Sequence, residues 1–277
     1  MSATSPALVL VGCGKMGGAL LSGWLAASRA GRDASVVVVE PAEASTAAFR
    51  GKPGVSVIAD ASQLPVGIAP SVVIFAVKPQ VMETIVPPYR GFVRPGTVFL
   101  SIAAGRTLGF LATHLGAAAA AVRSMPNTPA AVGRGITVAC ANKAVTAAQR
   151  ATCDGLLSAV GEVAWVDDEG LLDPVTAVSG SGPAYVFLLA ECLEEAGIAA
   201  GLPPDLARRL ARATVSGSGE LLHRSSEAAD QLRRNVTSPK GTTAAALEVL
   251  MAKDGGLQTL ITQAVAAAAK RSRELAG

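Results

Sequence analysis

The sequence predicts an α/β protein in which a parallel sheet with crossover helices is followed by an all-helical half. Over residues 1–166, short runs of branched aliphatic residues alternate with alanine-rich stretches, a pattern typical of strands joined by crossover helices. After Asp167 the valine-rich runs disappear and helical periodicity takes over. The predicted domains are therefore 1–166 and 167–277.

Eight apolar runs are predicted to be strands. Most are apolar at consecutive positions, as expected for strands that are buried on both faces. The runs are Ala7–Val11, Val36–Val39, Val55–Ile58, Val72–Val77, Val98–Ile102, Ala120–Ser124, Ile136–Ala139 and Glu162–Val166. The predicted helices are Met16–Trp24, Leu172–Ile198, Leu206–Leu222, Thr242–Met251 and Leu257–Leu275.

Composition narrows the function classes. The chain has 277 residues with 50% hydrophobic content, which is enough to bury the cores of two domains. A net charge of +3 and 4% aromatics do not suggest a nucleic-acid surface, so no nucleic-acid partner is expected. Helices as apolar as those of the second half usually need a partner surface, so we expect at least a homodimer.

The predicted location is the cytoplasm. No apolar stretch approaches the ~18 residues of a membrane span, and the N-terminal segment lacks the features of a secretory signal. The four cysteines, Cys13, Cys140, Cys153 and Cys192, form no CxxC pair, so no structural zinc or other metal site is expected. They are predicted to be free, buried thiols.

A glycine-rich segment, Gly12-Cys13-Gly14-Lys15-Met16-Gly17, follows the first strand and opens a helix. In this context GxGxxG predicts a dinucleotide site. Gly12 would permit the tight turn, Gly14 would let the backbone approach the pyrophosphate, and Gly17 would let helix and strand approach closely. The alternative is a glycine-rich turn without a ligand.

Glu40 ends the second strand, where an acid typically binds the adenine ribose of NAD and repels the extra phosphate of NADP. This position favours NADH. The long loop Ser28–Ser35 separates Glu40 from Gly17 by 23 residues, so the side chain is equally compatible with a solvated acid, and Arg50 is a cation that could reach a phosphate.

Other segments end strands at the same sheet edge, where ligands of open α/β sheets lie. Small residues in two of them would let a nicotinamide ribose approach, while Asn127 would hydrogen-bond a carboxamide. The alternative for Lys78 is an ordinary surface lysine. The alternative for Asn127 is an Asx turn that closes a loop. The residues are Ala76, Val77, Lys78, Pro79, Ile102, Ala103, Ala104 and Asn127.

Two segments of the helical half are unusual. Ser179–Tyr185 places two glycines and a proline inside a predicted helix, which favours a close approach to a ligand or another helix over a simple joint. Thr237-Ser238-Pro239-Lys240-Gly241-Thr242-Thr243 precedes a helix and carries more hydroxyls than one cap needs. It predicts either a carboxylate site at the helix N-terminus or an ordinary helix N-cap with additional hydroxyl side chains.

Histidine is scarce, with only His114 and His223 present. A dehydrogenase that reduces a ketone usually needs a strong acid such as histidine or lysine. An imine nitrogen can instead be protonated before hydride arrives, so one hydroxyl that hydrogen-bonds the nitrogen would suffice. The sequence thus favours reduction of a C=N bond.

These residues together resemble the Δ1-pyrroline-5-carboxylate reductase family, which catalyses the last step of proline biosynthesis. The segments GCGKMG, AVKPQ, RSMPNTPA, LDPVTAVSGSGPAY and VTSPKGTT stand in the order and spacing of that family. The resemblance implies a Rossmann-type domain, a helical dimerisation domain whose interface completes the active site, and hydride transfer from the nicotinamide C4 of NADPH to the imine carbon of L-1-pyrroline-5-carboxylate.

The resemblance also implies roles for single residues. Asn235 would add to the cofactor site. Ser238, Gly241, Thr242 and Thr243 would hold the substrate carboxylate, with the Thr243 hydroxyl against the ring nitrogen as the catalytic group. Glu169 resembles an acid at the substrate site.

Two residues depart from the family pattern. Lys240 replaces a glycine of SPGGTT, which costs energy if the position needs a positive φ. Glu40 stands where NADPH-preferring members have a hydroxyl or basic residue.

Two alternative functions stay open. The first is a β-hydroxyacid dehydrogenase, which needs a helix lysine that Leu172–Ile198 lacks. The second is a dinucleotide-sensing regulator without turnover.

Overall fold

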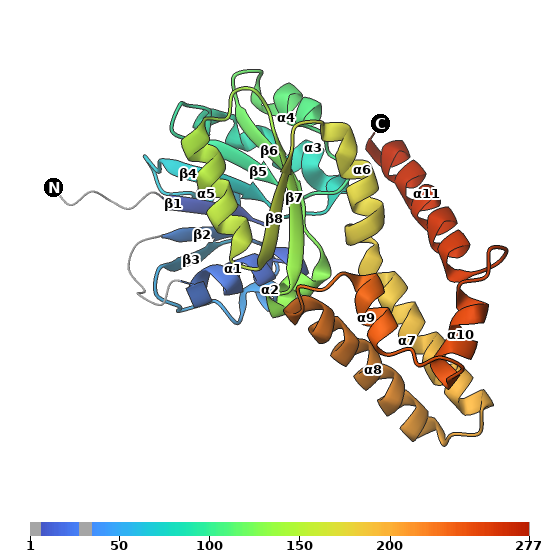
Figure 1. Ribbon diagram of the computed structural model, residues 1–277. Coiled ribbons are helices and arrows are strands. Elements are labelled where there is room, and N and C mark those ends of the chain that lie inside the picture. The colour runs from blue at the N-terminus through green and yellow to red at the C-terminus, as the bar shows by residue number, and fades with distance from the viewer. Residues whose placement is uncertain (1–6, 28–34, 277) are drawn as a thin grey trace. The chain divides into compact units, whose positions relative to one another are not determined.

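The computed structural model describes residues 7–27 and 35–276 (Figure 1). Most of the loop predicted over Ser28–Ser35 lies outside the described residues. The chain forms two compact units, Met1–Gly180 with Ala269–Gly277, and Ser181–Ala268. We call them the sheet unit and the helical unit. The predicted boundary between 166 and 167 concerns functional domains and stays a prediction.

The sheet unit is built on one sheet. Its order is β3-β2-β1-β4-β5-β6-β7-β8 among the described residues, and β1 to β6 follow the doubly wound order 3-2-1-4-5-6. Each predicted strand is present, which confirms the α/β fold class. The strands are β1 Ala7–Val11, β2 Val36–Val39, β3 Val55–Ile58, β4 Pro70–Phe75, β5 Val98–Ser101, β6 Ala120–Met125, β7 Gly135–Ala141 and β8 Gly161–Val166.

The prediction of a wholly parallel sheet is wrong at one junction. Strands β1 to β6 pair in parallel, but β7 pairs with β6 in antiparallel fashion, with Val122 opposite Ala141. The connection from Met125 to Gly135 holds only a short 3₁₀ turn, Thr128–Val132. A parallel return needs a crossover of a dozen or more residues, so the chain turns back, and β7 and β8 run opposite to the rest.

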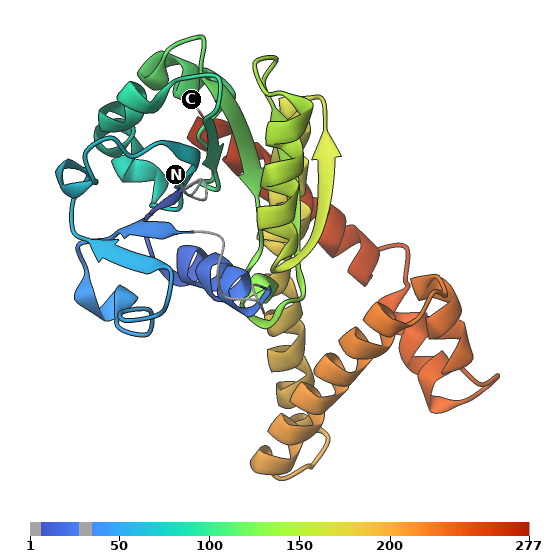
Figure 2. The ribbon, with the colours of Figure 1, turned by 90° about the vertical axis from the view of Figure 1, so that its left-hand side faces the viewer.

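Helices cover both faces of the sheet (Figure 2). Leu8 and Leu10 of β1 face a core shared with α1 and α5, whereas Val9 and Val11 face a second core shared with α3 and α4. Each such buried side chain contributes about 1.5–3 kcal/mol. The helices of this unit are α1 Lys15–Ala27, α2 Glu43–Thr46, α3 Met82–Ile85, α4 Leu108–Leu115, α5 Ala147–Ser158 and α6 Leu172–Val175.

The long helix predicted over Leu172–Ile198 is interrupted. It consists of α6, a π-helical turn Thr176–Gly180 and then α7, which begins at Gly182. A Cβ at Gly180 would lie 2.5 Å from Met125 Cε. Gly180 thus lies close to a side chain of β6, whereas the sequence predicted a close approach to a ligand or another helix.

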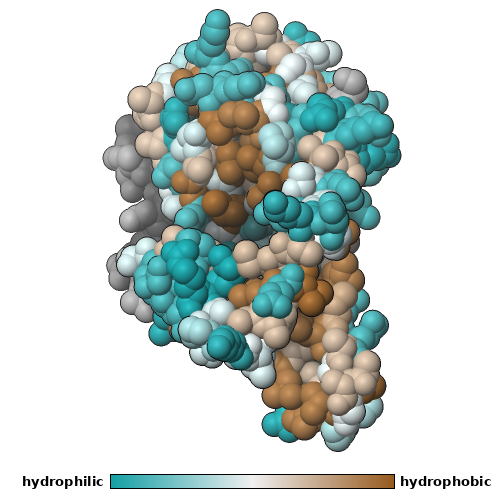
Figure 3. All heavy atoms as spheres, turned by 45° about the vertical axis from the view of Figure 1, so that its right-hand side comes forward, coloured by the Kyte–Doolittle hydropathy of each residue, from teal (hydrophilic) through white to brown (hydrophobic). Residues whose placement is uncertain are grey.

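The helical unit contains antiparallel helices with little buried surface. Of its described helix residues, Ala207 and Ala211 of α8 are buried, while Phe187 and Leu188 of α7 are 62% and 57% exposed. Hydrophobic side chains gather on this unit at the lower end of Figure 3. Its helices are α7 Gly182–Ala199, α8 Pro204–Arg224, α9 Ala229–Asn235, α10 Thr242–Leu250 and most of α11 Leu257–Ala276; α9 was not predicted.

The cysteines differ in burial. Cys13, Cys140 and Cys153 are buried, but Cys192 is exposed, so the prediction of four buried thiols is wrong for Cys192. It lies on α7, whose described side chains include none that is buried. In the part of the chain that the structure describes, no helix combines the length and apolar character needed to cross a bilayer.

Candidate functional site

The turn between β1 and α1 has the geometry that its glycines predict. Gly12 has φ +93°, and a Cβ there would lie 2.7 Å from both the Ala76 carbonyl oxygen and Val77 Cγ1. A Cβ at Gly17 would collide with the Gly12 carbonyl oxygen and lie 3.2 Å from Ala76 Cβ. Only glycine lets the turn, the helix and the end of β4 come this close.

Gly14 differs from the other two glycines because it borders open space. No heavy atom lies within 4 Å of a Cβ built at Gly14, and Gly14 and Lys15 are exposed. The N–H of Gly18 donates to the Gly14 carbonyl (2.8 Å), so helical bonding begins here. The helix N-terminus and the open turn together form a suitable cradle for an anionic pyrophosphate.

The Glu40 carboxylate points into this turn. One of its oxygens accepts the Cys13 N–H (2.8 Å) and the other accepts the Ala42 N–H (2.9 Å). The side chain is thus held at the dinucleotide turn rather than being free in solvent. Burial, with a smaller contribution from the Glu40 charge, raises the pKa of the Cys13 thiol to about 11, so this thiol is neutral at pH 7.

The ends of β4 and β5 lie next to the turn. Ala76 follows β4, and its N–H donates to the Val11 carbonyl (2.7 Å). The N–H of Ile102 donates to the Phe75 carbonyl (3.1 Å). Arg106 Nε donates to the Pro79 carbonyl (2.9 Å) and so ties the two loops together. Lys78 is exposed, Ala103 is buried, and Val77, Ile102 and Ala104 are half-buried.

Asn127 follows β6 and is buried (9% exposed). Its Oδ1 accepts the N–H of Ile136 (2.9 Å), so the side chain closes the loop between β6 and β7. The bond spans nine residues and is therefore not the Asx turn that the sequence offered as the alternative. The cofactor role of Asn127 stays a prediction.

In the helical unit, α10 begins at Thr242 with Gly241 as its N-cap. Gly241 has no side chain, and no side-chain hydrogen bond caps this helix in the described structure. The hydroxyl of Thr237 is used elsewhere, since it donates to the Arg233 carbonyl (2.6 Å). The first N–H groups of α10 therefore lack the cap that a Ser or Thr would provide, which leaves them available to an anion.

Lys240 sits in the left-handed region with φ 57°, the one non-glycine residue with a positive φ among those described. The strain expected at this glycine position is therefore present. Lys240→Gly is expected to raise the free energy of unfolding by up to about 1 kcal/mol, because glycine adopts this φ without steric cost.

Urea unfolding would test the Lys240 prediction. Lys240→Ala is the matched control, since it removes the charge and keeps the Cβ, so its stability should stay close to that of the parent chain. Equal stabilisation by alanine and glycine would show that charge, not φ, is responsible.

Asn235 ends α9 and belongs to a small polar cluster. Its Nδ2 donates to both carboxylate oxygens of Glu227 (3.3 and 3.2 Å), and its Oδ1 accepts from Gln231 Nε2 (2.7 Å). Glu227 has no motif around it that marks it in the sequence. The structure brings it to Asn235 because α9 and the turn before it fold the chain back over eight residues.

Glu169 lies in the sheet unit, in the 3₁₀ turn Glu169–Leu171 that precedes α6. Its Oε1 accepts from Arg123 Nη1 (2.9 Å) and from the N–H of Leu108 (2.8 Å). Arg123, inside the RSMPNTPA segment, is another residue that sequence reasoning missed. An arginine on a buried strand indicates that an acidic partner lies nearby, but the sequence does not show which residue this partner is.

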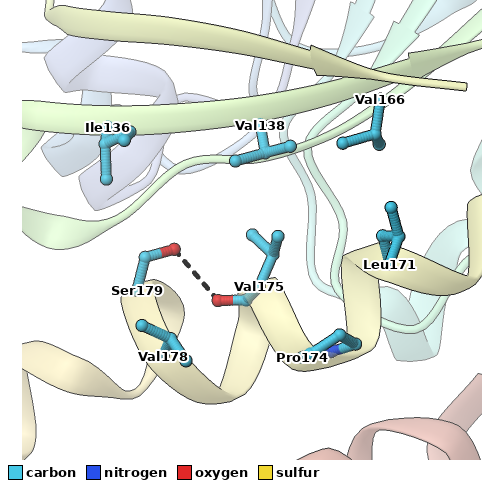
Figure 4. A pocket seen from close by; sticks show the side chains of 8 residues that line it. All are labelled: Ile136, Val138, Val166, Leu171, Pro174, Val175, Val178 and Ser179. Atoms are coloured by element: carbon cyan, nitrogen blue, oxygen red, sulfur yellow. Dashed lines mark hydrogen bonds between the residues drawn. The ribbon is translucent and has the colours of Figure 1, made fainter.

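The sheet unit also has an apolar pocket of about 420 Å³ between β7, β8 and the α6 segment (Figure 4). Ser179, its one polar side chain, donates to the Val175 carbonyl (3.0 Å). The pocket therefore offers no group for chemistry. It is lined by Ile136, Val138, Val166, Leu171, Pro174, Val175, Val178 and Ser179.

Two family models match the chain. Residues 7–105 match NADP oxidoreductase coenzyme F420-dependent, and residues 169–275 match pyrroline-5-carboxylate reductase dimerisation. The chain is also 38% identical over 274 residues to a pyrroline-5-carboxylate reductase from Pseudomonas aeruginosa, covering 99% of this chain and 98% of that protein. The chain belongs to the pyrroline-5-carboxylate reductase family.

Other family members agree along the whole length. The pea (Pisum sativum) reductase is 38% identical over 270 residues, or 97% of this chain and 95% of its own. A solved reductase from Coxiella burnetii has a TM-score of 0.88 at 33% identity, with 99% of each chain covered. A Plasmodium falciparum pyrroline carboxylate reductase with NADP bound has a TM-score of 0.79 at 27% identity, again over 99% of each chain.

For this member of the reductase family, the predicted site residues fall into two groups. The sheet unit brings together Gly12 to Gly17, Glu40, the end of β4 and the end of β5. The helical unit holds Asn235 at the end of α9 and the hydroxyl-rich segment at the start of α10. The dimerisation match indicates that the helical half serves homo-oligomerisation, in agreement with the apolar surface of α7.

Proposed function

We propose that the chain reduces L-1-pyrroline-5-carboxylate to L-proline with NADPH as the reductant. The observation that carries the proposal is the end-to-end match with reductases of this name. Two helix starts of this chain, at the β1–α1 turn and at α10, are suited to an anion and support it. NADPH would bind at the β1–α1 turn, and the substrate carboxylate at the start of α10. When bound, the reduced nicotinamide supplies the hydride that the imine carbon accepts.

The residues of the sheet unit fit a dinucleotide. Gly14 leaves space for a pyrophosphate, and the small residues Ala76, Ala103 and Ala104 leave room for the nicotinamide ribose. Lys15 and Met16 would contribute through the helix start, and Lys78 through its exposed ammonium. The cofactor role of Asn235 stays a prediction. The Plasmodium falciparum relative holds NADP, which supports NADPH here, while NADH stays open.

The helical unit fits a small carboxylate. Backbone N–H groups at Thr242 and Thr243, with the Ser238 and Thr242 hydroxyls nearby in sequence, would hold the acid group at the positive end of α10. The Thr243 hydroxyl would hydrogen-bond the ring nitrogen. Because this nitrogen is protonated before reduction, the site needs to position the substrate but needs no strong general acid. This suits a chain with two histidines. A direct substrate contact by Glu169 also stays a prediction.

The first test is oxidation of NADPH and NADH, side by side, with pyrroline-5-carboxylate as the substrate. Turnover with either cofactor would support the reductase. Cofactor binding without turnover would favour a dinucleotide-sensing regulator instead, and turnover of a β-hydroxyacid would favour the dehydrogenase alternative.

Glu40 should control the choice between the cofactors. Glu40→Gln keeps an oxygen for the Cys13 N–H and removes the negative charge beside the ribose. It is expected to raise the ratio of kcat/KM for NADPH over NADH about tenfold, because charge repulsion of about 1.4 kcal/mol with the additional phosphate is lost.

The control for Glu40 is Glu162→Gln, which removes an exposed charge on β8. It should leave the ratio unchanged. An unaltered ratio in Glu40→Gln would mean that the carboxylate serves the turn and not the ribose.

We further propose that the functional domains are 1–166 and 167–277, and that two or more copies associate through the helical domain. The exposed apolar side chains of α7 support this. The proposed compartment is the cytoplasm, where reducing conditions keep thiols such as Cys192 unpaired.

A further inference from the structure

An ion pair between a buried arginine and a partly exposed glutamate joins two elements of the sheet unit that are far apart in sequence. Arg123 of β6 has a side chain only 6% exposed, and its Nη1 lies 2.9 Å from Glu169 Oε1. By contrast, Arg50 and Glu43 form a pair at 3.2 Å whose side chains are 54% and 85% exposed. A buried charge is costly unless it is paired, so Arg123 fixes where the Glu169 carboxylate lies.

The same carboxylate oxygen holds the start of α4. It accepts the N–H of Leu108, the first residue of that helix, at 2.8 Å. Thr107 caps the helix by accepting from the N–H of Phe110 (3.0 Å). A carboxylate at a helix N-terminus is favoured by the helix dipole. Glu169 thus anchors the point where the loop that follows β5 enters α4.

That loop, Ile102–Thr107, carries part of the proposed cofactor site. It begins with Ile102, Ala103 and Ala104, and Arg106 ties it to the β4 loop through the Pro79 carbonyl. At its other end stands Leu108, held by Glu169. The chain of contacts from Arg123 through Glu169 to Leu108 therefore determines where the β5–α4 loop can sit.

We propose that Arg123 and Glu169 are positioning residues that hold the β5–α4 loop in the shape that the nicotinamide end of the cofactor requires. The inference rests on the proposed function. It gives Glu169 a role that needs no substrate contact, because its Oε1 accepts from both Arg123 and Leu108. The requirement for position is strict, because small displacements in a reduction site cost large factors in rate.

The test compares Glu169→Ala, Glu169→Gln and Arg123→Met with a double variant that combines Glu169→Ala and Arg123→Met. The control, Arg271→Met, breaks an exposed pair with Glu274. NADPH affinity would be measured by nicotinamide fluorescence, with kcat and both KM values by steady-state kinetics. Hydrogen exchange at the Leu108 amide would report the anchor directly, and thermal unfolding would show that each variant is folded.

We expect Glu169→Ala and Arg123→Met each to weaken NADPH binding about tenfold. The double variant should bind NADPH as well as either single variant, because both changes break the same contact. Glu169→Gln should keep most of the affinity, since its amide oxygen can accept from Leu108. Exchange at Leu108 should quicken in Glu169→Ala. The KM for pyrroline-5-carboxylate should not change in Arg123→Met, and Arg271→Met should behave like the parent chain.

Parental NADPH affinity in folded Glu169→Ala would overturn the proposal. So would a raised KM for pyrroline-5-carboxylate in both Glu169 variants with a normal Arg123→Met, which would make Glu169 a substrate contact. If Arg123→Met does not fold, the two Glu169 variants and the exchange rates decide. Absence of turnover in the parent would contradict the proposed function, while NADPH binding would still report the positioning role.

Discussion

Thr243→Ala is expected to lower kcat for pyrroline-5-carboxylate reduction by about 100-fold, because the hydroxyl proposed to hydrogen-bond the ring nitrogen is lost. Thr243 is the second residue of α10 and is half-buried. Its removal should change the free energy of unfolding by less than about 0.5 kcal/mol. Steady-state kinetics together with urea unfolding would separate the two effects.

Two further variants sharpen the Thr243 experiment. Thr243→Ser keeps the hydroxyl and should retain most of the turnover, whereas Thr243→Val keeps the shape and should behave like alanine. Unchanged turnover in the alanine variant would remove Thr243 from the mechanism. Equal loss in serine and valine would point to packing of the side chain rather than to its hydroxyl.

Gly14→Ala is expected to weaken NADPH binding by about 10- to 100-fold, which corresponds to an overpacking cost of about 1–3 kcal/mol. In the ligand-free chain no heavy atom lies within 4 Å of the added methyl group, so the melting temperature without cofactor should not change. Only a pyrophosphate that approaches this turn would meet the methyl group. Cofactor titration and thermal unfolding, each with and without NADPH, would check the prediction.

Gly12→Ala is the matched contrast to Gly14→Ala. Its Cβ would lie 2.7 Å from the Ala76 carbonyl oxygen at a φ of +93°, so this variant should be destabilised even without cofactor. Parental NADPH affinity in Gly14→Ala would show that the pyrophosphate does not pass over this turn.

Local sequence patterns predicted much of the fold. Leu8 to Val11 are apolar at consecutive positions because each side of β1 faces its own core, and this burial was predictable from hydrophobicity alone. The β1–α1 turn was predictable because Gly12 and Gly17 stand where a Cβ would meet neighbouring atoms, while Gly14 borders open space. Lys240 is the exception, and its position was still marked by the family pattern that places glycine there.

Other features depend on contacts that no local pattern encodes. α9 is short and polar, with residues such as Asp230 and Arg234 paired on its surface, so it shows little apolar periodicity. The direction of β7 followed from the short connection after Met125. The orientation of Glu40 toward Cys13 could not be predicted from its place at a strand end.

The sequence by itself determined the strands of the sheet, the change to a helical half, the dinucleotide turn and the hydroxyl-rich start of α10. These are set by neighbouring residues, whose spacing decides burial and backbone conformation. Only the tertiary structure decided that Glu169 faces Arg123, 46 positions away, and Leu108, 61 positions away. The physical reason is that a carboxylate accepts from the donors that the folded chain brings to it, and these donors come from a strand, β6, and a helix, α4.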